Sequence, residues 1–169
     1  MRHNILYSIA FSALIAGCAG SPQKAPVATQ PEALQRPAPA VRAQRAEALL
    51  QALLALGVDY RNGGRSPNQG FDCSGLVAHV FREAYGMHLP HNTRAQSEMG
   101  VPVSFAELEP GDLVFYNTLD RPFSHVGIYL GDSRFVHAPK TGASVRVERI
   151  RSAYWSNRFN GARRINPPI

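Results

Sequence analysis

The strongest constraint on the fold is a change of hydrophobic period about halfway along the 169-residue chain. From about Ala43 to Tyr85, apolar residues recur at three- and four-residue spacing, which predicts helices that end at Gly57 and Gly86. From Val101 onward the apolar residues form short alternating runs, which predict strands. Helices followed by a run of strands indicate an α+β fold, with N-terminal helices packed on a small antiparallel β-sheet.

The same patterns predict the individual elements. The first helix should bury an apolar stripe made of Ala46, Leu49, Leu50, Leu53, Leu54 and Leu56. The second helix should run from about Ser74 to Tyr85, and either Asn92 or Thr93 should cap a short third helix. Strands are expected at 113–116, 125–130, 134–137, about 145–150 and 162–165.

The first 42 residues are expected to lie outside the folded domain, which should span 43–169. Residues 1–17 have a basic start, a short apolar stretch and small residues at the end, as in a signal peptide. Residues 18–42 are rich in Pro and Ala and predict a semi-extended tether.

Cys18 directly follows the small residues Ala16 and Gly17, an arrangement that resembles the bacterial lipobox. We therefore expect Cys18 to be acylated, with fatty acids such as palmitate, and to anchor the chain in a membrane. Ala19 rather than Asp after this cysteine favours the periplasmic face of the Gram-negative outer membrane. The alternative is an ordinary signal peptide followed by a chance cysteine.

The formal net charge of +6 allows an acidic partner such as nucleic acid, anionic lipid or an acidic polymer. A solvated basic face is the alternative interpretation. The sequence contains no nucleic-acid motif, no ladder of stacking aromatic residues and no zinc-ligand spacing, so we expect no nucleic-acid partner, no metal and no cofactor.

Cys73 lies where a polar loop, residues 61–70, meets the second predicted helix. The first N–H groups of a helix lack intrahelical partners and carry partial positive charge, which should push a thiol toward the nucleophilic thiolate. The alternative is an inert buried cysteine, because free cysteines are among the most buried residues. The residues around Cys73 leave both interpretations open.

Two of the six histidines, His125 and His137, lie on the predicted hairpin. With a three-residue turn at 131–133, Leu130 faces Arg134 and Ile128 faces Val136. The two histidines are then diagonal neighbours on one face, roughly 7–8 Å apart at Cα. A two-residue turn would put them on opposite faces.

A nucleophilic cysteine needs a nearby base, and the base needs an orienting group, so this pair favours catalysis. The alternative is a structural role for one or both histidines. Of the others, His79 follows Cys73 by six residues in the same helix and cannot reach back to its start. His88 and His91 flank a proline in a loop, where we expect solvated side chains.

Several motifs occur in order between about Ala43 and Ile165: Tyr60-Arg61-Asn62-Gly63-Gly64, Phe71-Asp72-Cys73-Ser74-Gly75-Leu76-Val77, Leu89-Pro90, Pro110-Gly111-Asp112-Leu113-Val114-Phe115, Ser124-His125-Val126-Gly127-Ile128-Tyr129-Leu130-Gly131 and Phe135-Val136-His137-Ala138. Together they resemble the NlpC-type papain-like cysteine peptidases of bacterial cell walls. One such motif would be weak evidence, whereas the ordered set is specific.

The resemblance implies a papain-like fold in which Cys73 is the nucleophile, His125 the general base and His137 the orienting residue. Tyr60 matches a tyrosine beside the active site that helps to bind the oxyanion. Asp72 and Ser74 match motif positions next to the nucleophile, and Ser74 is associated with substrate binding.

The implied function is a peptidoglycan (murein) endopeptidase that hydrolyses an amide bond of the stem peptide or of the cross-link. Its partner would be the peptidoglycan stem peptide. The alternatives are a non-catalytic wall-binding lipoprotein and an amidase or transacylase on the same fold. Asp59, Asn62 and His91 depart from the family pattern. They are not triad positions, so they bear on substrate preference more than on activity.

Overall fold

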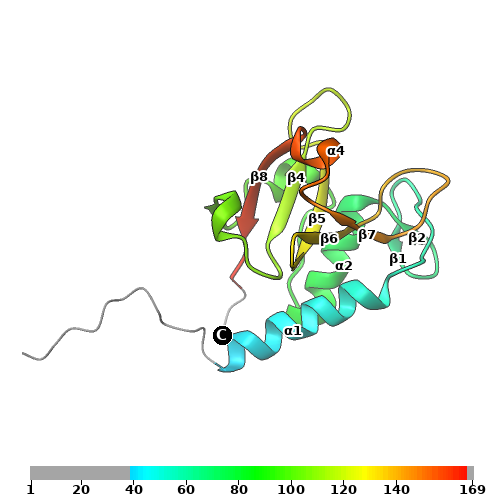
Figure 1. Cartoon of the computed structure of the whole chain (residues 1–169). Helices are drawn as coiled ribbons and strands as arrows, with labels where there is room; N and C mark the ends of the chain where they lie inside the picture. The colour runs from blue at the N-terminus through cyan, green and yellow to red at the C-terminus, as the bar shows by residue number, and fades with distance from the viewer. Residues whose placement is uncertain (1–38, 167–169) are drawn as a thin grey trace, which may run out of the picture. The chain divides into compact units, whose positions relative to one another are not determined.

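The computed structural model describes residues 39–166, and the predicted signal peptide, Cys18 and residues 19–38 of the predicted tether lie outside the described residues. Figure 1 shows the elements in chain order. The helices are α1 (Pro39–Leu54), α2 (Cys73–Tyr85), α3 (Thr93–Gln96), a 3₁₀ helix (Phe105–Glu107) and α4 (Ala153–Ser156). The strands are β1 (Arg65–Ser66), β2 (Gly70–Phe71), β3 (Val101–Val103), β4 (Leu113–Tyr116), β5 (His125–Gly131), β6 (Arg134–His137), β7 (Arg146–Arg149) and β8 (Phe159–Arg164).

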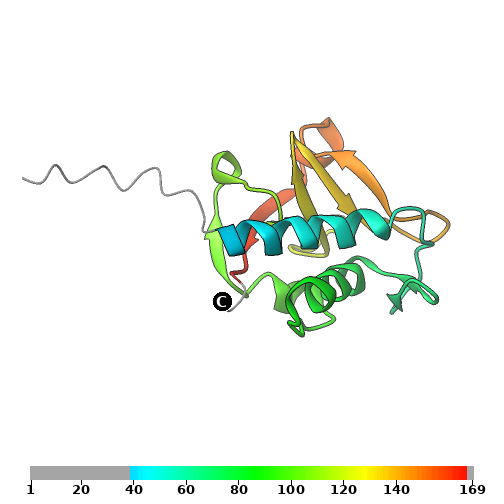
Figure 2. The ribbon, with the colours of Figure 1, turned by 90° about the horizontal axis from the view of Figure 1, so that it is seen from below.

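Six of the strands form one antiparallel sheet in the order β3-β8-β4-β5-β6-β7. The long helices α1 and α2 run side by side along one face of this sheet (Figure 1, Figure 2). The predicted α+β class, with the helices packed on an antiparallel sheet, is therefore confirmed. The small β1–β2 hairpin lies inside the polar loop and was not expected from the sequence.

The two faces of the sheet carry separate hydrophobic clusters, as the alternation of side chains along a strand requires. Val126, Ile128 and Val136 belong to the cluster that the helices cover. Tyr116 and Phe135 point to the opposite face and pack with Trp155 of α4. The side chains of His125 and His137 lie in this second aromatic layer.

The expected burial of a leucine stripe on the first helix is wrong. Helix α1 begins at Pro39, four residues before the predicted start of the domain, and buries alanines, namely Ala48, Ala52 and the following Ala55. Leu50, Leu53, Leu54 and Leu56 are exposed, with Leu54 at 67% exposure. The side chain of alanine is a single methyl group, so this face lets α1 pack closely against α2. Within residues 39–166, no helix combines the length and apolar character needed to cross a membrane.

The second helix forms as the sequence predicts, and its ends explain why. Asp72 is the N-cap, and its carboxylate accepts a hydrogen bond from the backbone N–H of Gly75. Gly86 ends the helix in the left-handed conformation, with a φ of 64°. Of the two candidates for the cap of α3, Asn92 is the one observed.

The β5–β6 hairpin has the expected pair of Ile128 with Val136, but its turn differs from the predicted one. Asp132 and Ser133 both have positive φ and form a two-residue turn, so Gly131 pairs with Arg134. The predicted pair of Leu130 with Arg134 is therefore wrong. Leu130 lies in an irregularity between Tyr129 and Gly131, a bulge that adds one residue to β5. The bulge restores the predicted pair of Ile128 with Val136.

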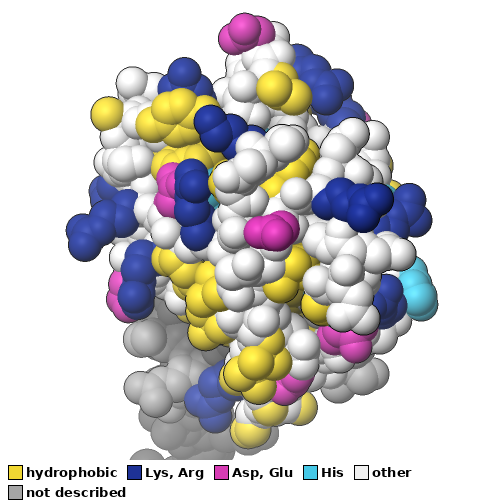
Figure 3. Space-filling view, turned by 90° about the vertical axis from the view of Figure 1, so that its right-hand side faces the viewer, with side chains coloured by type: hydrophobic (Ala, Val, Ile, Leu, Met, Phe, Trp, Pro, Cys, Tyr) yellow, Lys and Arg dark blue, Asp and Glu magenta, His cyan; other side chains and the backbone are white. Residues whose placement is uncertain are grey.

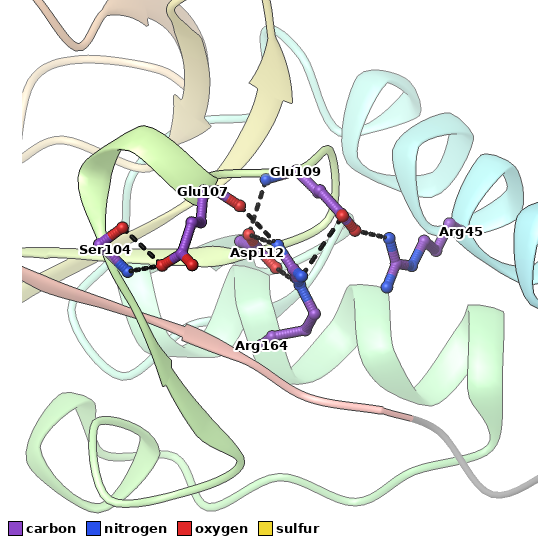
Figure 4. Close-up of polar contacts among 6 residues, drawn as sticks. All are labelled: Arg45, Ser104, Glu107, Glu109, Asp112 and Arg164. Atoms are coloured by element: carbon purple, nitrogen blue, oxygen red, sulfur yellow. Dashed lines mark hydrogen bonds and ion pairs between the residues drawn. The ribbon is translucent and has the colours of Figure 1, made fainter. Parts of the chain in front are cut away.

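A polar network ties the last strand to the sheet and to α1 (Figure 4). Arg164 on β8 donates two 2.8 Å hydrogen bonds to the buried carboxylate of Asp112, next to β4. Glu109 forms ion pairs with both Arg164 and Arg45 of α1. Because charge-assisted bidentate pairs are directional, this network fixes the start of β4 and thereby its neighbour β5.

On the face shown in Figure 3, Lys and Arg side chains lie scattered among hydrophobic and acidic ones. This distribution agrees with the interpretation of the positive charge as a solvated surface.

Candidate active site

Cys73 is the first residue of α2, and the carboxylate of Asp72 holds the loop around it. Besides Gly75 N–H, Asp72 accepts hydrogen bonds from the backbone N–H of Gly63 at 3.0 Å and from Ser74 Oγ at 3.0 Å. His91 Nε2 lies 2.8 Å from the same carboxylate and donates to it, because a carboxylate can only accept. His91 is therefore not the solvated loop residue expected from the sequence.

The environment of the thiol also differs from expectation. Burial raises the pKa of Cys73 to about 11, and the nearby carboxylate of Asp72 adds to the rise. Backbone hydrogen bonds at Val126, Ser74 and Cys73 itself act in the opposite direction but are smaller causes. The predicted shift toward thiolate is thus wrong for this structure, because desolvation of the charged form outweighs the helix start. At neutral pH the residue is a thiol.

Cys73 and His125 line one cavity of about 170 Å³, at the end of β5 that faces the start of α2. Tyr60 forms part of the same wall, and its pKa is raised by burial and then by the charges of Cys73 and Asp72. Asp72 and Ser74 do not line this cavity, since Ser74 is buried and bonded to Asp72. A substrate-binding role for Ser74 stays a prediction.

The cavity continues into a larger one of about 410 Å³. The two share the wall formed by Thr118, Leu119, Pro139 and Lys140. The larger one is also lined by Arg146, Glu148, Ser152, Tyr154 and Trp155. A groove with exposed apolar and cationic side chains therefore leads away from the thiol on the histidine side.

His125 and His137 are direct neighbours, as the predicted register requires. Nε2 of His125 lies 2.8 Å from Nδ1 of His137, and both side chains are buried. Burial lowers the pKa of each histidine to about 3, helped by His137 in the case of His125 and by Arg146 in the case of His137. Both imidazoles are therefore neutral near pH 7, which is the state a general base needs.

The buried histidines should make the protein less stable in acid. An unfolded histidine titrates near 6.5, whereas the folded ones stay neutral down to about 3. As pH falls from about 6.5 toward about 3, the unfolded state alone takes up protons. The free energy of unfolding should therefore fall, by up to about 1.4 kcal/mol per pH unit for each histidine.

Urea titrations at several pH values would check this slope. His137→Asn should make it shallower, while the same change at exposed His88 should leave it unaltered. A wild-type stability that is flat between pH 4 and pH 6.5 would contradict the expectation.

The sequence did not predict that Trp155 and Glu148 lie beside the two histidines. The indole of Trp155 stacks on His125 at 5.5 Å between ring centroids, and its Nε1 donates to Glu148. Glu148 lies on β7, beside His137. The alternation of Val145 and Val147 could have indicated Glu148. Two apolar residues on one face of the strand place Arg146 and Glu148 on the opposite face.

The chain is similar to several known proteins. The sequence model of the NlpC/P60 family matches residues 57–164. The chain is 46% identical over 109 residues to the Escherichia coli (strain K12) protein named murein DD-endopeptidase MepS/murein LD-carboxypeptidase, covering 64% of this chain and 56% of that protein. It is 39% identical over 112 residues to the Bacillus subtilis gamma-DL-glutamyl hydrolase, covering 66% of this chain and 27% of that protein.

Among solved structures, the peptidoglycan hydrolase RipB from Mycobacterium tuberculosis superposes with a TM-score of 0.65 at 30% identity. The superposition covers 79% of this chain and 70% of that one. The two relatives compared by sequence extend well beyond the part that this chain matches.

Proposed function

Because the chain belongs to the NlpC/P60 family, we propose that it is a peptidoglycan endopeptidase whose nucleophile is Cys73. The observation that carries the proposal is the buried pair of His125 and His137, 2.8 Å apart, with His125 on the wall of the cavity that holds the thiol. A nucleophile, a base and an orienting group in this order constitute the minimal apparatus for acyl transfer.

In the proposed mechanism, His125 removes the proton of the Cys73 thiol while sulfur attacks the carbonyl carbon of the substrate amide. We propose that the proton moves during the attack, which agrees with the raised pKa of the thiol and the lowered pKa of the imidazole. The Tyr60 hydroxyl and the backbone N–H of Cys73 are the donors proposed for the oxyanion. His125 then protonates the leaving amine, and water hydrolyses the acyl-enzyme.

Two bonds are candidates, D-glutamyl–diaminopimelate within a stem and D-alanyl–diaminopimelate in the cross-link. One relative is named a DD-endopeptidase and another a gamma-DL-glutamyl hydrolase, so the relatives' names support both. In each bond diaminopimelate is the leaving amine. The proton donor His125 lies on the side of the groove lined by Lys140 and Arg146, where we propose that this half binds.

Digestion of purified sacculi, followed by mass spectrometry of the products, tests the proposal. We expect soluble muropeptides that carry a newly freed amine on diaminopimelate. Release of ammonia or of an intact stem peptide would indicate an amidase, and exchange onto an added amine would indicate a transacylase. Binding to sacculi without any cleavage would support the wall-binding alternative and contradict the enzyme.

We further propose that Cys18 is acylated and holds the domain at the periplasmic face of the Gram-negative outer membrane. The support comes from Ala16, Gly17 and Ala19 around that cysteine. The intact mass of the protein extracted from membranes tests this anchor. A mature chain that begins elsewhere than at Cys18, or that carries no acyl mass, would contradict it.

A further inference from the structure

The far side of His137 faces a carboxylate. Nε2 of His137 lies 3.5 Å from Oε1 of Glu148, and the His137 side chain is completely buried. Among residues 39–166, this nitrogen has no hydrogen-bond partner. A buried ring nitrogen without a partner is unusual, because buried polar atoms are normally paired, and here it lies beside a carboxylate that is 25% exposed.

Glu148 is held in place by donors. Arg146 Nε donates to Oε1 at 2.6 Å, and the indole of Trp155 donates to Oε2. A carboxylate offers acceptors only, so a ring nitrogen that faces it is favoured when it carries hydrogen. A lone pair on His137 Nε2 would instead face the negative charge at 3.5 Å. The neutral His137 is therefore the tautomer protonated at Nε2.

The tautomer of His137 determines the tautomer of His125. Protonated at Nε2, His137 has its lone pair on Nδ1 and accepts the 2.8 Å hydrogen bond from His125 Nε2–H. The neutral His125 then carries its own lone pair on Nδ1. That nitrogen is the one left for the thiol of Cys73, on the cavity that both residues line. The opposite tautomers would leave His125 unable to take the proton.

We propose that Glu148 is a positioning residue that sets the tautomer of His137 and, through it, the tautomer of His125. The proposal rests on the proposed function only in giving His125 the role of the base. Trp155 supports the same arrangement, because its indole both stacks on His125 and donates to Glu148.

Kinetics with muropeptides give the first test. Glu148→Gln should lower kcat about 10- to 100-fold, a typical effect of removing such a supporting group. KM reports separately on Arg146, which donates to Glu148 on the wall of the groove. In a His137→Asn background the same substitution should cause no further loss, because Glu148 acts through His137. Losses that multiply in the double variant would overturn the proposal. The matched control is Glu98→Gln, which removes an exposed carboxylate paired with Arg94 on α3 and should leave kcat unchanged.

The tautomers can also be observed without turnover. In Cys73→Ala protein with ¹⁵N-labelled histidine, NMR at neutral pH should show hydrogen on Nε2 of both His125 and His137. Glu148→Gln should shift His137 toward the Nδ1–H form, and Glu148→Asp, which keeps a carboxylate, should retain Nε2–H even if the Gln variant folds poorly. An Nδ1–H form of His137 in the protein with Glu148 intact would overturn the proposal. Because this readout needs no substrate, failure of the proposed hydrolysis would leave its result meaningful.

Discussion

Cys73→Ala is expected to lower the rate of sacculus cleavage by at least about 10,000-fold, because loss of a nucleophile removes the covalent route altogether. In barrier terms this is about 5.5 kcal/mol. The measurement is the release of soluble muropeptides, compared with wild-type protein at equal concentration. Cleavage that persists in the variant would remove Cys73 from the mechanism.

The fold should survive this substitution. Cys73 is the first residue of α2, and the helix start is held by the carboxylate of Asp72 rather than by the sulfur. Cys73 is partly buried and lines a cavity, so the substitution removes one sulfur atom from a wall that is open on one side. Circular dichroism and the thermal midpoint should therefore match the wild type closely. Binding of muropeptides to the variant would show that its groove is intact.

Gly75→Ala should destabilise the protein by about 3 kcal/mol or more, although alanine favours a helix over glycine by about 1 kcal/mol. A Cβ at this position would lie 2.0 Å from the backbone oxygen of Gly64 and 2.9 Å from His91 Nε2. The first neighbour is backbone, so the clash cannot be relieved by a side-chain rotation. The loop that precedes the nucleophile would have to move away from α2.

Urea unfolding measures this effect. Glu83→Ala, at an exposed site on the same helix, is the control and should change stability by no more than about 0.5 kcal/mol. If Gly75→Ala were as stable as the wild type, the close contact between α2 and the loop at Gly64 would be wrong. A destabilised Gly75→Ala that regains cleavage at low temperature would locate the damage in stability rather than in chemistry.

The periodicity of apolar residues predicted an element correctly where its capping residues and its apolar face also match the packing around it. The second helix has a capping residue, an apolar stripe and a terminal glycine in one stretch, and it forms as expected. Helix α1 carries two competing apolar faces, leucines and alanines, and hydrophobicity alone selected the leucines. What decides between them is the space available beside α2, which depends on residues far away in the chain.

At the candidate site, too, the sequence predicted what depends on one hairpin and not what depends on the packing of separate elements. Pairing rules brought His125 and His137 together, because cross-strand neighbours follow from alternation. The state of the thiol could not be predicted in this way, since burial at Cys73 depends on the packing of α2 against β5. Glu148 reaches His137 through the pairing of β7 with β6, and Trp155 reaches His125 through the packing of α4 on the sheet. Alternation assigns a residue to one face of its strand, but it does not say which residues of neighbouring elements that residue will contact.

The bulge at Leu130 has a consequence for how this hairpin can change during evolution or engineering. A two-residue turn and one unpaired residue together give the spacing that keeps His125 and His137 on one face. The pairing of β5 with β4 and of β6 with β7 holds each histidine on its own strand, so residues added between Gly131 and Arg134 should lengthen the turn and leave both imidazoles on one face. Deleting Leu130 should remove the bulge and likewise keep the pair of Ile128 with Val136. A peptide grafted between Gly131 and Arg134 should therefore be tolerated whether its number of residues is odd or even.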